Sequence, residues 1–324
     1  MSELSELSEG VLSCSIVGVV GKVGGVGVVL MPTIKKWDIE QWIKTIATGD
    51  FHYTSVLGIG KNLSPEQSTR LRKIMYEICH SPKPICESIG KRDGWYRPIQ
   101  DEPPDLEWQS LEEGKDSGLI LPFDLRKYVF IYPDTTTVVA GSKSSGKTGF
   151  LYRTVVLNMN RMNTILLTNL EGGKSMLRDR FYDMDIEIPE PAPFRIKPAF
   201  DNFHDYIKEK NSLYVIDYID APDGTDFYLI GAQIKKVDNK LQGLNSVAVI
   251  GLQKPMGRDT AFGGEQTLKA ATLYIAMDTN KLKIVDAKVP ADKNFHPKNM
   301  QWTFIYQDSG TKFSNIQLSY EQGF

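Results

Sequence analysis

The sequence has little of what metal sites, disulfide frameworks and polycationic surfaces are made from. Its 324 residues include three cysteines and four histidines, which form no CxxC pair and no metal-ligand spacing. We therefore expect neither a zinc site nor a disulfide framework, and this cysteine usage is typical of a reducing, cytoplasmic compartment. The net charge of −2 excludes a polycation, so any contact with nucleic acid must come from local basic patches.

The first 31 residues lack the features of a secretory signal or a membrane span. They begin with the acidic repeat SELSELSEG and continue as a Val/Gly tract that contains Lys22. A signal has a basic start and a compact apolar core, and a span needs about 20 mainly apolar residues. We predict a low-complexity tail over residues 1–31, with Met31 as an alternative start and with no membrane partner.

Residues 32–100 are expected to form a small separate domain. Ser64 precedes a proline and has Gln67 three residues later, which predicts a helix with a capping box. A hairpin is expected around Asp93-Gly94. The apolar positions of the helix form one stripe at i, i+3, i+4, i+7 spacing: Leu71, Ile74, Met75 and Ile78. Helices followed by a hairpin are the order of a winged helix, which many small α+β units share.

Two functions fit this domain. Its second helix is basic, and the hairpin tip carries Lys91, Arg92 and Arg97, which predicts contact with DNA. A protein-docking module with a solvated basic face fits equally well, because a basic patch is only an electrostatic footprint. The acidic segment 101–118 that follows is punctuated by Pro and Gly and is predicted to be a linker.

Residues 119–324 alternate between apolar runs and helical segments. The runs TTTVVAG, TILLTNLE, SLYVIDYID, SVAVIGLQ and TLYIAMD are bounded by polar turns. Such alternation indicates an α/β domain with a mainly parallel sheet and helices on its faces. The later segments KLKIVDAKVP and MQWTFIYQD are expected to add an antiparallel edge.

A phosphate-binding loop is predicted between the first of these strands and the helix after it. The residues match the pattern GxxxxGK[ST] in that context. Glycines let backbone N–H groups curl around phosphates, Lys147 neutralises the β and γ oxygens, and the Thr148 hydroxyl ligates Mg²⁺. The predicted ATP-binding residues are Gly141, Ser142, Lys143, Ser144, Ser145, Gly146, Lys147 and Thr148.

Three further strand ends carry polar side chains suited to this chemistry. Asp217 ends an apolar strand and is predicted to hold Mg²⁺, whereas Asp220 and Asp223 are interpreted as turn residues. Glu171 is predicted to accept a proton from the attacking water, and capping the following helix is the alternative. Gln253 is predicted to sense the γ-phosphate through a hydrogen bond.

The loop after Gln253 is basic, and its composition predicts mobility. Lys254, Arg258 and Lys269 are candidate contacts to the phosphates of a nucleic-acid strand. A flexible surface loop without a ligand is the alternative.

Together these motifs resemble the RecA-like ATPases and, among them, the DnaB-type replicative helicases. The segment TNLEGGKSMLRDRF is similar to the helicase strand end that carries a glutamate. VIDYID resembles the Walker B strand, and GLQKP resembles the sensor strand. GGEQTLKAATLYIAMD resembles the end of the second DNA-binding loop of recombinases. The resemblance covers residues 119 to 290.

The resemblance implies a RecA-like P-loop core that hydrolyses ATP with Mg²⁺. It gives catalytic roles to Lys147, Glu171 and Gln253, and metal contacts to Thr148 and Asp217. It also implies single-stranded DNA in a central channel and a homohexameric ring that works with other replication proteins.

The chain departs from the helicases at one position. Their Lys-x-Arg motif reaches the nucleotide of a neighbouring subunit, whereas here Lys288 is kept, Pro290 replaces the arginine, and Lys293 is a candidate substitute. A weakened charge predicts slow turnover, since such a charge can supply several orders of magnitude in rate. The compact size and the winged-helix-like unit resemble a phage or plasmid replication protein that acts in the bacterial cytoplasm.

The sequence therefore predicts an α/β, RecA-like P-loop core preceded by a small winged-helix-like domain. The leading function is an ATP-dependent DNA motor, a ring-forming replicative helicase. A RecA/RadA-like recombinase and a regulatory ATP-binding module without unwinding activity are the alternatives. Translocation polarity, subunit number and the identity of the arginine finger do not follow from the residues.

Overall fold

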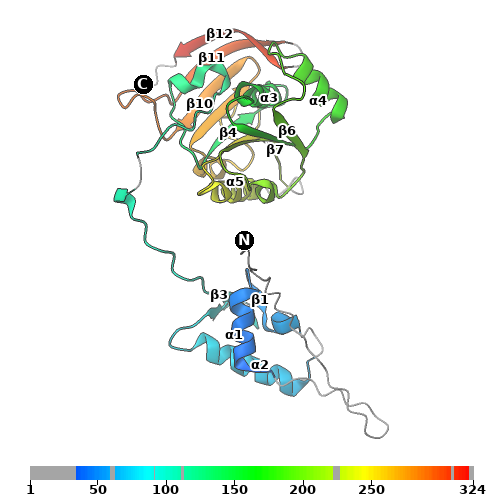
Figure 1. Ribbon diagram of the computed structural model, residues 1–324, viewed down its shortest axis with the longest axis vertical. Helices are drawn as coiled ribbons and strands as arrows, with labels where there is room; N and C mark the ends of the chain where they lie inside the picture. The colour runs from blue at the N-terminus through cyan, green and yellow to red at the C-terminus, as the bar shows by residue number, and fades with distance from the viewer. Residues whose placement is uncertain are drawn as a thin grey trace, which may run out of the picture. The chain divides into compact units, whose positions relative to one another are not determined.

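The computed structural model describes residues 34–58, 63–90, 92–110, 113–221, 227–307 and 310–320. The chain forms two compact units, residues 1–110 and 111–324 (Figure 1). The tail predicted over residues 1–31 and the candidate DNA contact Lys91 lie outside the described residues. Within the described ranges, no helix is long and apolar enough to cross a bilayer.

The N-terminal unit packs two helices against a small antiparallel sheet of order β1-β3-β2. Its elements are α1 (Lys36–Thr45), β1 (Phe51–His52), η1 (Tyr53–Gly58), α2 (Pro65–Cys79), β2 (Cys86–Ser88), β3 (Trp95–Pro98) and η2 (Trp108–Ser110). The predicted capping box is confirmed: Ser64 Oγ accepts from Gln67 N–H at 3.2 Å, and Gln67 Oε1 accepts from Ser64 N–H at 3.0 Å. The predicted stripe of α2 is buried in the core of this unit.

Two cysteines meet in this unit. Cys79 ends α2 and Cys86 begins β2, and their Sγ atoms lie 3.4 Å apart. Both are free thiols, and burial raises the pKa of each. The sequence did not predict this contact, because Cys79 and Cys86 have no CxxC spacing and become neighbours only through the turn of the chain after α2.

The second unit is built on a nine-stranded sheet of order β12-β11-β10-β9-β4-β8-β7-β5-β6. The strands are β4 (Thr135–Gly141), β5 (Asn163–Thr168), β6 (Phe194–Pro198), β7 (Ser212–Ile219), β8 (Val247–Gln253), β9 (Leu273–Asp278), β10 (Lys281–Ala287), β11 (Met300–Gln307) and β12 (Lys312–Tyr320). The helices are η3 (Pro122–Lys127), α3 (Lys147–Asn158), α4 (Gly173–Tyr182), η4 (Phe203–Tyr206), α5 (Tyr228–Leu241) and α6 (Gln266–Lys269).

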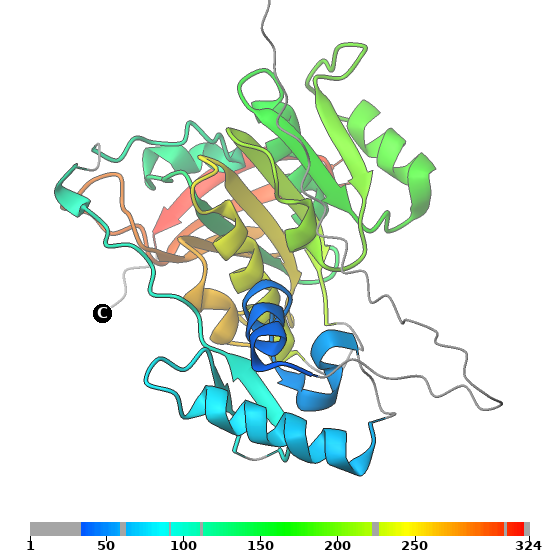
Figure 2. The same ribbon diagram turned by 60° about the horizontal axis from the view of Figure 1, so that its bottom comes forward.

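The pairing confirms the predicted sheet. The strands from β9 to β6 in this order pair in parallel, whereas β9, β10, β11 and β12 pair antiparallel in succession. Figure 2 shows the antiparallel strands, orange to red, beside the parallel strands, yellow to green. The two edge strands β6 and β12 were not predicted from the sequence.

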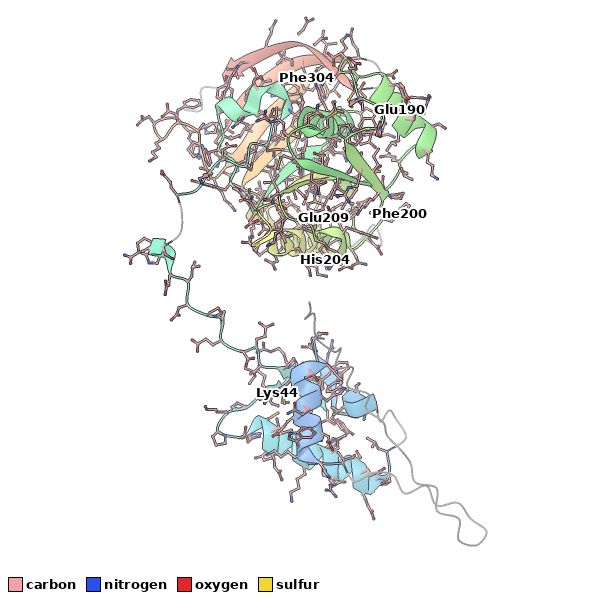
Figure 3. The ribbon with its side chains drawn as sticks, viewed as in Figure 1. Lys44, Glu190, Phe200, His204, Glu209 and Phe304 are labelled. Atoms are coloured by element: carbon pink, nitrogen blue, oxygen red, sulfur yellow. The ribbon has the colours of Figure 1, made fainter. Side chains whose placement is uncertain are left out.

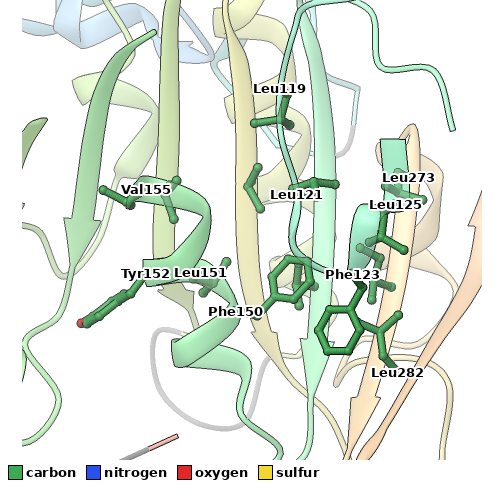
Figure 4. Packing of buried hydrophobic residues seen from close by; sticks show 14 of the residues in the cluster. Leu119, Leu121, Phe123, Leu125, Phe150, Leu151, Tyr152, Val155, Leu273 and Leu282 are labelled. Carbon is green, nitrogen blue, oxygen red and sulfur yellow. The ribbon is translucent and has the colours of Figure 1, made fainter. Parts of the chain in front are cut away.

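Both faces of the parallel sheet are covered, which explains its continuous apolar runs. Successive residues of β4 point to opposite faces, so Val139 joins a core with Phe150 of α3, and Val138 joins a second core with Ile234 of α5. Figure 1 shows α3 and α5 on opposite sides of the sheet. On the α3 side, Phe150 stacks on Phe123 of η3 with ring centroids 6.2 Å apart (Figure 4).

The antiparallel strands are tied to the same core by aromatic side chains. Phe304 of β11 (Figure 3) lies 5.1 Å from Phe123 and 5.2 Å from Phe313 of β12, measured between ring centroids. A Cβ placed on Gly146 would lie 3.2 Å from the Phe313 ring. The hairpin of β11 and β12 is therefore packed against the start of α3.

Candidate nucleotide-binding site

The predicted phosphate-binding loop joins the carboxyl end of β4 to the start of α3. A side chain at Gly141 would collide with Ser145 Oγ at 2.6 Å and with Lys147 Cβ at 2.7 Å. Gly146, just before α3, has φ +86°, which favours glycine. The turn therefore requires the glycines of the motif, and it leaves the N–H groups of the helix start available to an anion.

The Lys147 side chain is buried at the bottom of this loop, with 7% of its surface exposed. Its Nζ lies 3.8 Å from the centroid of the Tyr218 ring. Burial lowers the pKa of this ammonium, and the carboxylates of Asp217 and Glu171 partly oppose the shift. A charged ammonium held in a partly dry site is suited to binding phosphate oxygens.

Asp217 lies beside the loop at the end of β7. It is 4% exposed, and Thr148 Oγ1 donates to its Oδ1 at 3.4 Å. Burial raises the pKa of its carboxyl, and the nearby Lys147 ammonium and Thr148 hydroxyl oppose this. The structure thus brings together both predicted metal ligands.

Glu171 follows β5, the strand next to β7. Thr168 pairs with Asp217 in parallel register, and Asn169 N–H donates to Asp217 O at 3.2 Å. Glu171 is exposed, and its carboxylate acts on the pKa values of Lys147, Asp217 and Tyr218. The alternative of a helix cap is not seen, because α4 begins after Gly172 and has no side-chain cap.

Gln253 ends β8, which pairs in parallel with the P-loop strand. Its register partner is Gly141, so the two strand ends are adjacent. The carbonyl of Gln253 accepts from Phe262 N–H at 3.0 Å, which ties the following loop back to this strand. The predicted sensor is therefore placed between the P-loop and the basic loop.

Lys254 does not fit its predicted role as a DNA contact. Its side chain is buried, and its Nζ donates to Asp278 Oδ1 at 2.6 Å and to Arg258 O at 2.7 Å. The Lys254 ammonium therefore links the basic loop to the carboxylate at the end of β9 and points into the protein, where it cannot contact DNA. Arg258, Lys269 and Arg92 are exposed.

Lys288 and its own P-loop lie at opposite ends of the sheet's central strands. Ala287 pairs with Leu273 at the start of β9, whereas Gly141 pairs with Met277 near its end. These positions are about 13 Å apart along the strand. Lys288 Nζ donates to Lys269 O at 3.1 Å. Any contact of Lys288 with nucleotide must therefore involve another subunit.

Three residues that the sequence did not single out surround the loop. The Tyr218 ring faces the Lys147 ammonium, and only its place directly after Asp217 could have indicated this. The Tyr306 hydroxyl donates to the carbonyl of Ser144 at the crest of the loop. Arg180 of α4 acts on the pKa values of Asp217 and Tyr152. The contact of Tyr306 with Ser144 joins distant segments and has no local signal.

The residues present fit a nucleoside triphosphate with Mg²⁺. The Ser145 hydroxyl is buried with no hydrogen-bond partner among the described residues, beside a loop too tight for any residue but glycine at position 141. Among the described residues, no cluster of three His, Cys, Asp or Glu side chains could hold a metal alone. Mg²⁺ is usually bound by one or two protein oxygens together with phosphates, which Thr148 and Asp217 could supply.

No family model and no curated protein matches the chain. Two similar solved structures are a RadB recombinase and a KaiC-like protein from Pyrococcus horikoshii OT3. The first is 16% identical, covers 57% of this chain and 92% of its own, and has a TM-score of 0.43. The second is 15% identical, covers 63% of this chain and 99% of its own, and has a TM-score of 0.47.

Likenesses with TM-scores of 0.43 and 0.47 carry no conclusion about this chain. The chain's own topology, with the P-loop at the end of β4 and the acid-bearing β7 beyond β8, confirms the predicted α/β class with a mainly parallel sheet. The activity is therefore argued from the residues of this chain.

Proposed function

We propose that the second unit binds ATP with Mg²⁺ and hydrolyses it. The observation that carries this proposal is the convergence of Lys147, Thr148 and Asp217 at the carboxyl ends of β4 and β7, which flank β8, with Glu171 after the neighbouring β5. An ammonium, a metal-binding hydroxyl, a metal-binding carboxylate and a second carboxylate are the groups that phosphoryl transfer to water requires.

Each residue has a separate task in this proposal. The N–H groups at the start of α3 and the Lys147 ammonium bind the phosphate oxygens. Thr148 and Asp217 hold the metal, which screens negative charge when it is bound with the nucleotide. Glu171 takes a proton from the attacking water, and the amide of Gln253 lies at the adjacent strand end, where it can report the state of the γ-phosphate.

A comparison of wild type with Lys147→Ala tests this function. Wild type should bind MgATP and release phosphate, and the variant should lose both, because the charge that meets the phosphates is removed. Lys236→Ala is the control, since that lysine is exposed on α5, away from the phosphate-binding loop. A Kd of 1 mM corresponds to a binding free energy of only about 4 kcal/mol. Wild type that binds no nucleotide even at millimolar concentration would overturn the proposal.

We further propose that nucleotide turnover is coupled to a strand of DNA. Arg258 and Lys269 are exposed on the segment that follows Gln253, so phosphate contacts there could respond to the nucleotide. Unwinding and strand exchange are two forms of this function. RadB is described as a recombinase, and we give strand exchange at least equal place with unwinding.

Two measurements separate these forms. Single-stranded DNA should stimulate phosphate release in wild type and less so in Arg258→Ala/Lys269→Ala. Electron microscopy with DNA should show closed rings for a helicase and open filaments for a recombinase. Nucleotide binding without any DNA-stimulated turnover would instead support a regulatory module.

A further inference from the structure

The buried ammonium of Lys147 has an unusual partner. No carboxylate among the described residues lies within ion-pair distance of it, and its Nζ faces the Tyr218 ring, 3.8 Å from the ring centroid. An ammonium removed from water without a paired charge is unfavourable. An aromatic face offsets part of that cost, and more so where water is excluded.

The local structure of β7 aims Tyr218 at this position. Successive strand residues normally point to opposite faces, yet Asp217 and Tyr218 both reach the P-loop. The pairing of β7 with β8 is irregular between Ile216 and Ile219, and such irregularities redirect side chains. On β8, a Cβ at Gly251 would lie 3.4 Å from Tyr218 Cβ, so the glycine leaves room for the ring.

The other end of Tyr218 faces the turn that carries Glu171. Burial raises the pKa of its hydroxyl, and the Asn169 side chain lies near enough to that hydroxyl to oppose the rise. The Asn169 side-chain oxygen accepts from Glu171 N–H at 3.1 Å, and its own N–H donates to Asp217 O at 3.2 Å. One side chain therefore touches both the phosphate-binding lysine and the turn that precedes the predicted general base.

We propose that Tyr218 is a positioning residue with two separable parts, a ring that holds the Lys147 ammonium at the phosphate site and a hydroxyl that holds the Asn169 turn and, through it, Glu171. This inference rests on the proposed ATPase function. The ring acts on nucleotide binding and the hydroxyl acts on the chemical step, so the two parts predict different effects of substitution.

Equilibrium binding of a non-hydrolysable ATP analogue and steady-state phosphate release separate the two parts. Tyr218→Phe keeps the ring, so its analogue affinity should stay within about twofold of wild type while kcat falls about tenfold, the size expected for one lost hydrogen bond. Tyr218→Leu removes both parts and should also weaken analogue binding about tenfold, as expected for a desolvated cation–π contact. A Phe variant equal to wild type in kcat, or a Leu variant equal in affinity, overturns the corresponding part.

A double-mutant cycle tests the contact without nucleotide. Lys147→Met and Tyr218→Leu should be non-additive by about fivefold or more in the unfolding equilibrium constant, because each variant removes the partner of the other. The control is Arg178→Met with Tyr182→Leu. That pair is also a cation over a ring, at 4.4 Å, but Tyr182 is 71% exposed, and its coupling should be only about twofold.

The outcomes distinguish this inference from the proposed function. Wild type that binds no analogue would refute the ATPase proposal, and the cycle would still measure the Lys147–Tyr218 contact. Wild type that binds and hydrolyses ATP, with additive variants in the cycle and no separation of affinity from kcat, would refute the inference alone.

Discussion

Lys147 has a property that sets how its binding should depend on pH. Burial lowers the pKa of its ammonium, so the charge is lost at a lower pH than for an exposed lysine. The affinity for a triphosphate depends on that charge. The sign is therefore a loss of affinity as pH rises through the lowered pKa, with full affinity below it.

The affinity of wild type for the non-hydrolysable analogue should fall at a pH below the ordinary lysine range of about 10.4. The affinity of Lys147→Arg can differ from that of wild type, but it should not change over this pH range, since a guanidinium stays charged. Titration calorimetry at several pH values gives the profile. An affinity for wild type that is flat up to the ordinary lysine range would contradict a buried, poorly solvated ammonium.

Glu209 gives a second pH effect at the residue scale. Arg195 Nη2 donates to its Oε2, and Asn163 donates to it as well, so the pKa of this carboxyl is lowered to about 2. Because the folded pKa is below the unfolded value, the ion pair stabilises the fold above about pH 4.3, and the contribution is lost as pH falls toward 2.

Glu209→Gln should therefore lower the free energy of unfolding near neutral pH and have little effect near pH 2. Both side chains are more than a third exposed, so the loss should be at most about 1 kcal/mol. Urea unfolding at the two pH values measures it, with exposed Glu187→Gln as the control. An equal loss at both pH values would show that charge is not involved.

At the scale of elements, α3 and the hairpin of β11 and β12 approach closely at Gly149. A Cβ on Gly149 would lie 1.6 Å from the carbonyl oxygen of Gly310. Alanine is a better helix residue than glycine by about 1 kcal/mol, but overpacking against backbone costs about 1–3 kcal/mol. Because the clash is with backbone atoms, which cannot rotate away, its cost should exceed the gain in helix propensity.

Gly149→Ala should therefore lower the midpoint of thermal unfolding of the second unit and weaken nucleotide binding, because the start of α3 must shift. Gly49→Ala is the control for added methyl groups, since a Cβ there meets nothing within 4 Å. A Gly149→Ala protein as stable as wild type would show that the hairpin of β11 and β12 can move away from α3 without loss of stability.

The P-loop and the parallel core could be predicted because their signals are local. The spacing from Gly141 to Thr148 predicts a turn, and short apolar runs such as ILL, LYVI and LYIAM predict buried strands. The role of Lys254 could not, because its carboxylate partner is Asp278, 24 positions later. Nor could the contact of Tyr306 with Ser144, which joins segments 162 positions apart. Edge strand β6 was missed because FRIKP alternates charged and apolar residues and lacks a continuous run.

At the scale of the whole molecule, the position of Lys288 bears on assembly. It lies at the end of the strands opposite to its own P-loop, so a role in hydrolysis requires a neighbouring copy. The prediction of a ring or filament therefore includes sites shared between subunits. Arg92 and Arg97 of the N-terminal unit stay candidate DNA contacts.

Lys288→Ala and Lys147→Ala should each be inactive alone, and a mixture of the two should regain phosphate release. In the mixture, a Lys147→Ala subunit supplies its intact Lys288 to the intact P-loop of a Lys288→Ala neighbour. Mixing after subunit exchange and measuring phosphate release tests this. No recovery from a mixture shown to contain mixed oligomers would exclude Lys288 as the group that acts across subunits.

The most direct test of the account is phosphate release by Glu171→Gln at saturating MgATP. If Glu171 accepts the proton of the attacking water, this variant should bind ATP as wild type does and release phosphate at least about a hundredfold more slowly, the size of a general-base contribution. Glu187→Gln should behave as wild type. A Glu171→Gln protein that turns over at the wild-type rate would contradict the claim that this carboxylate and the P-loop form one catalytic site.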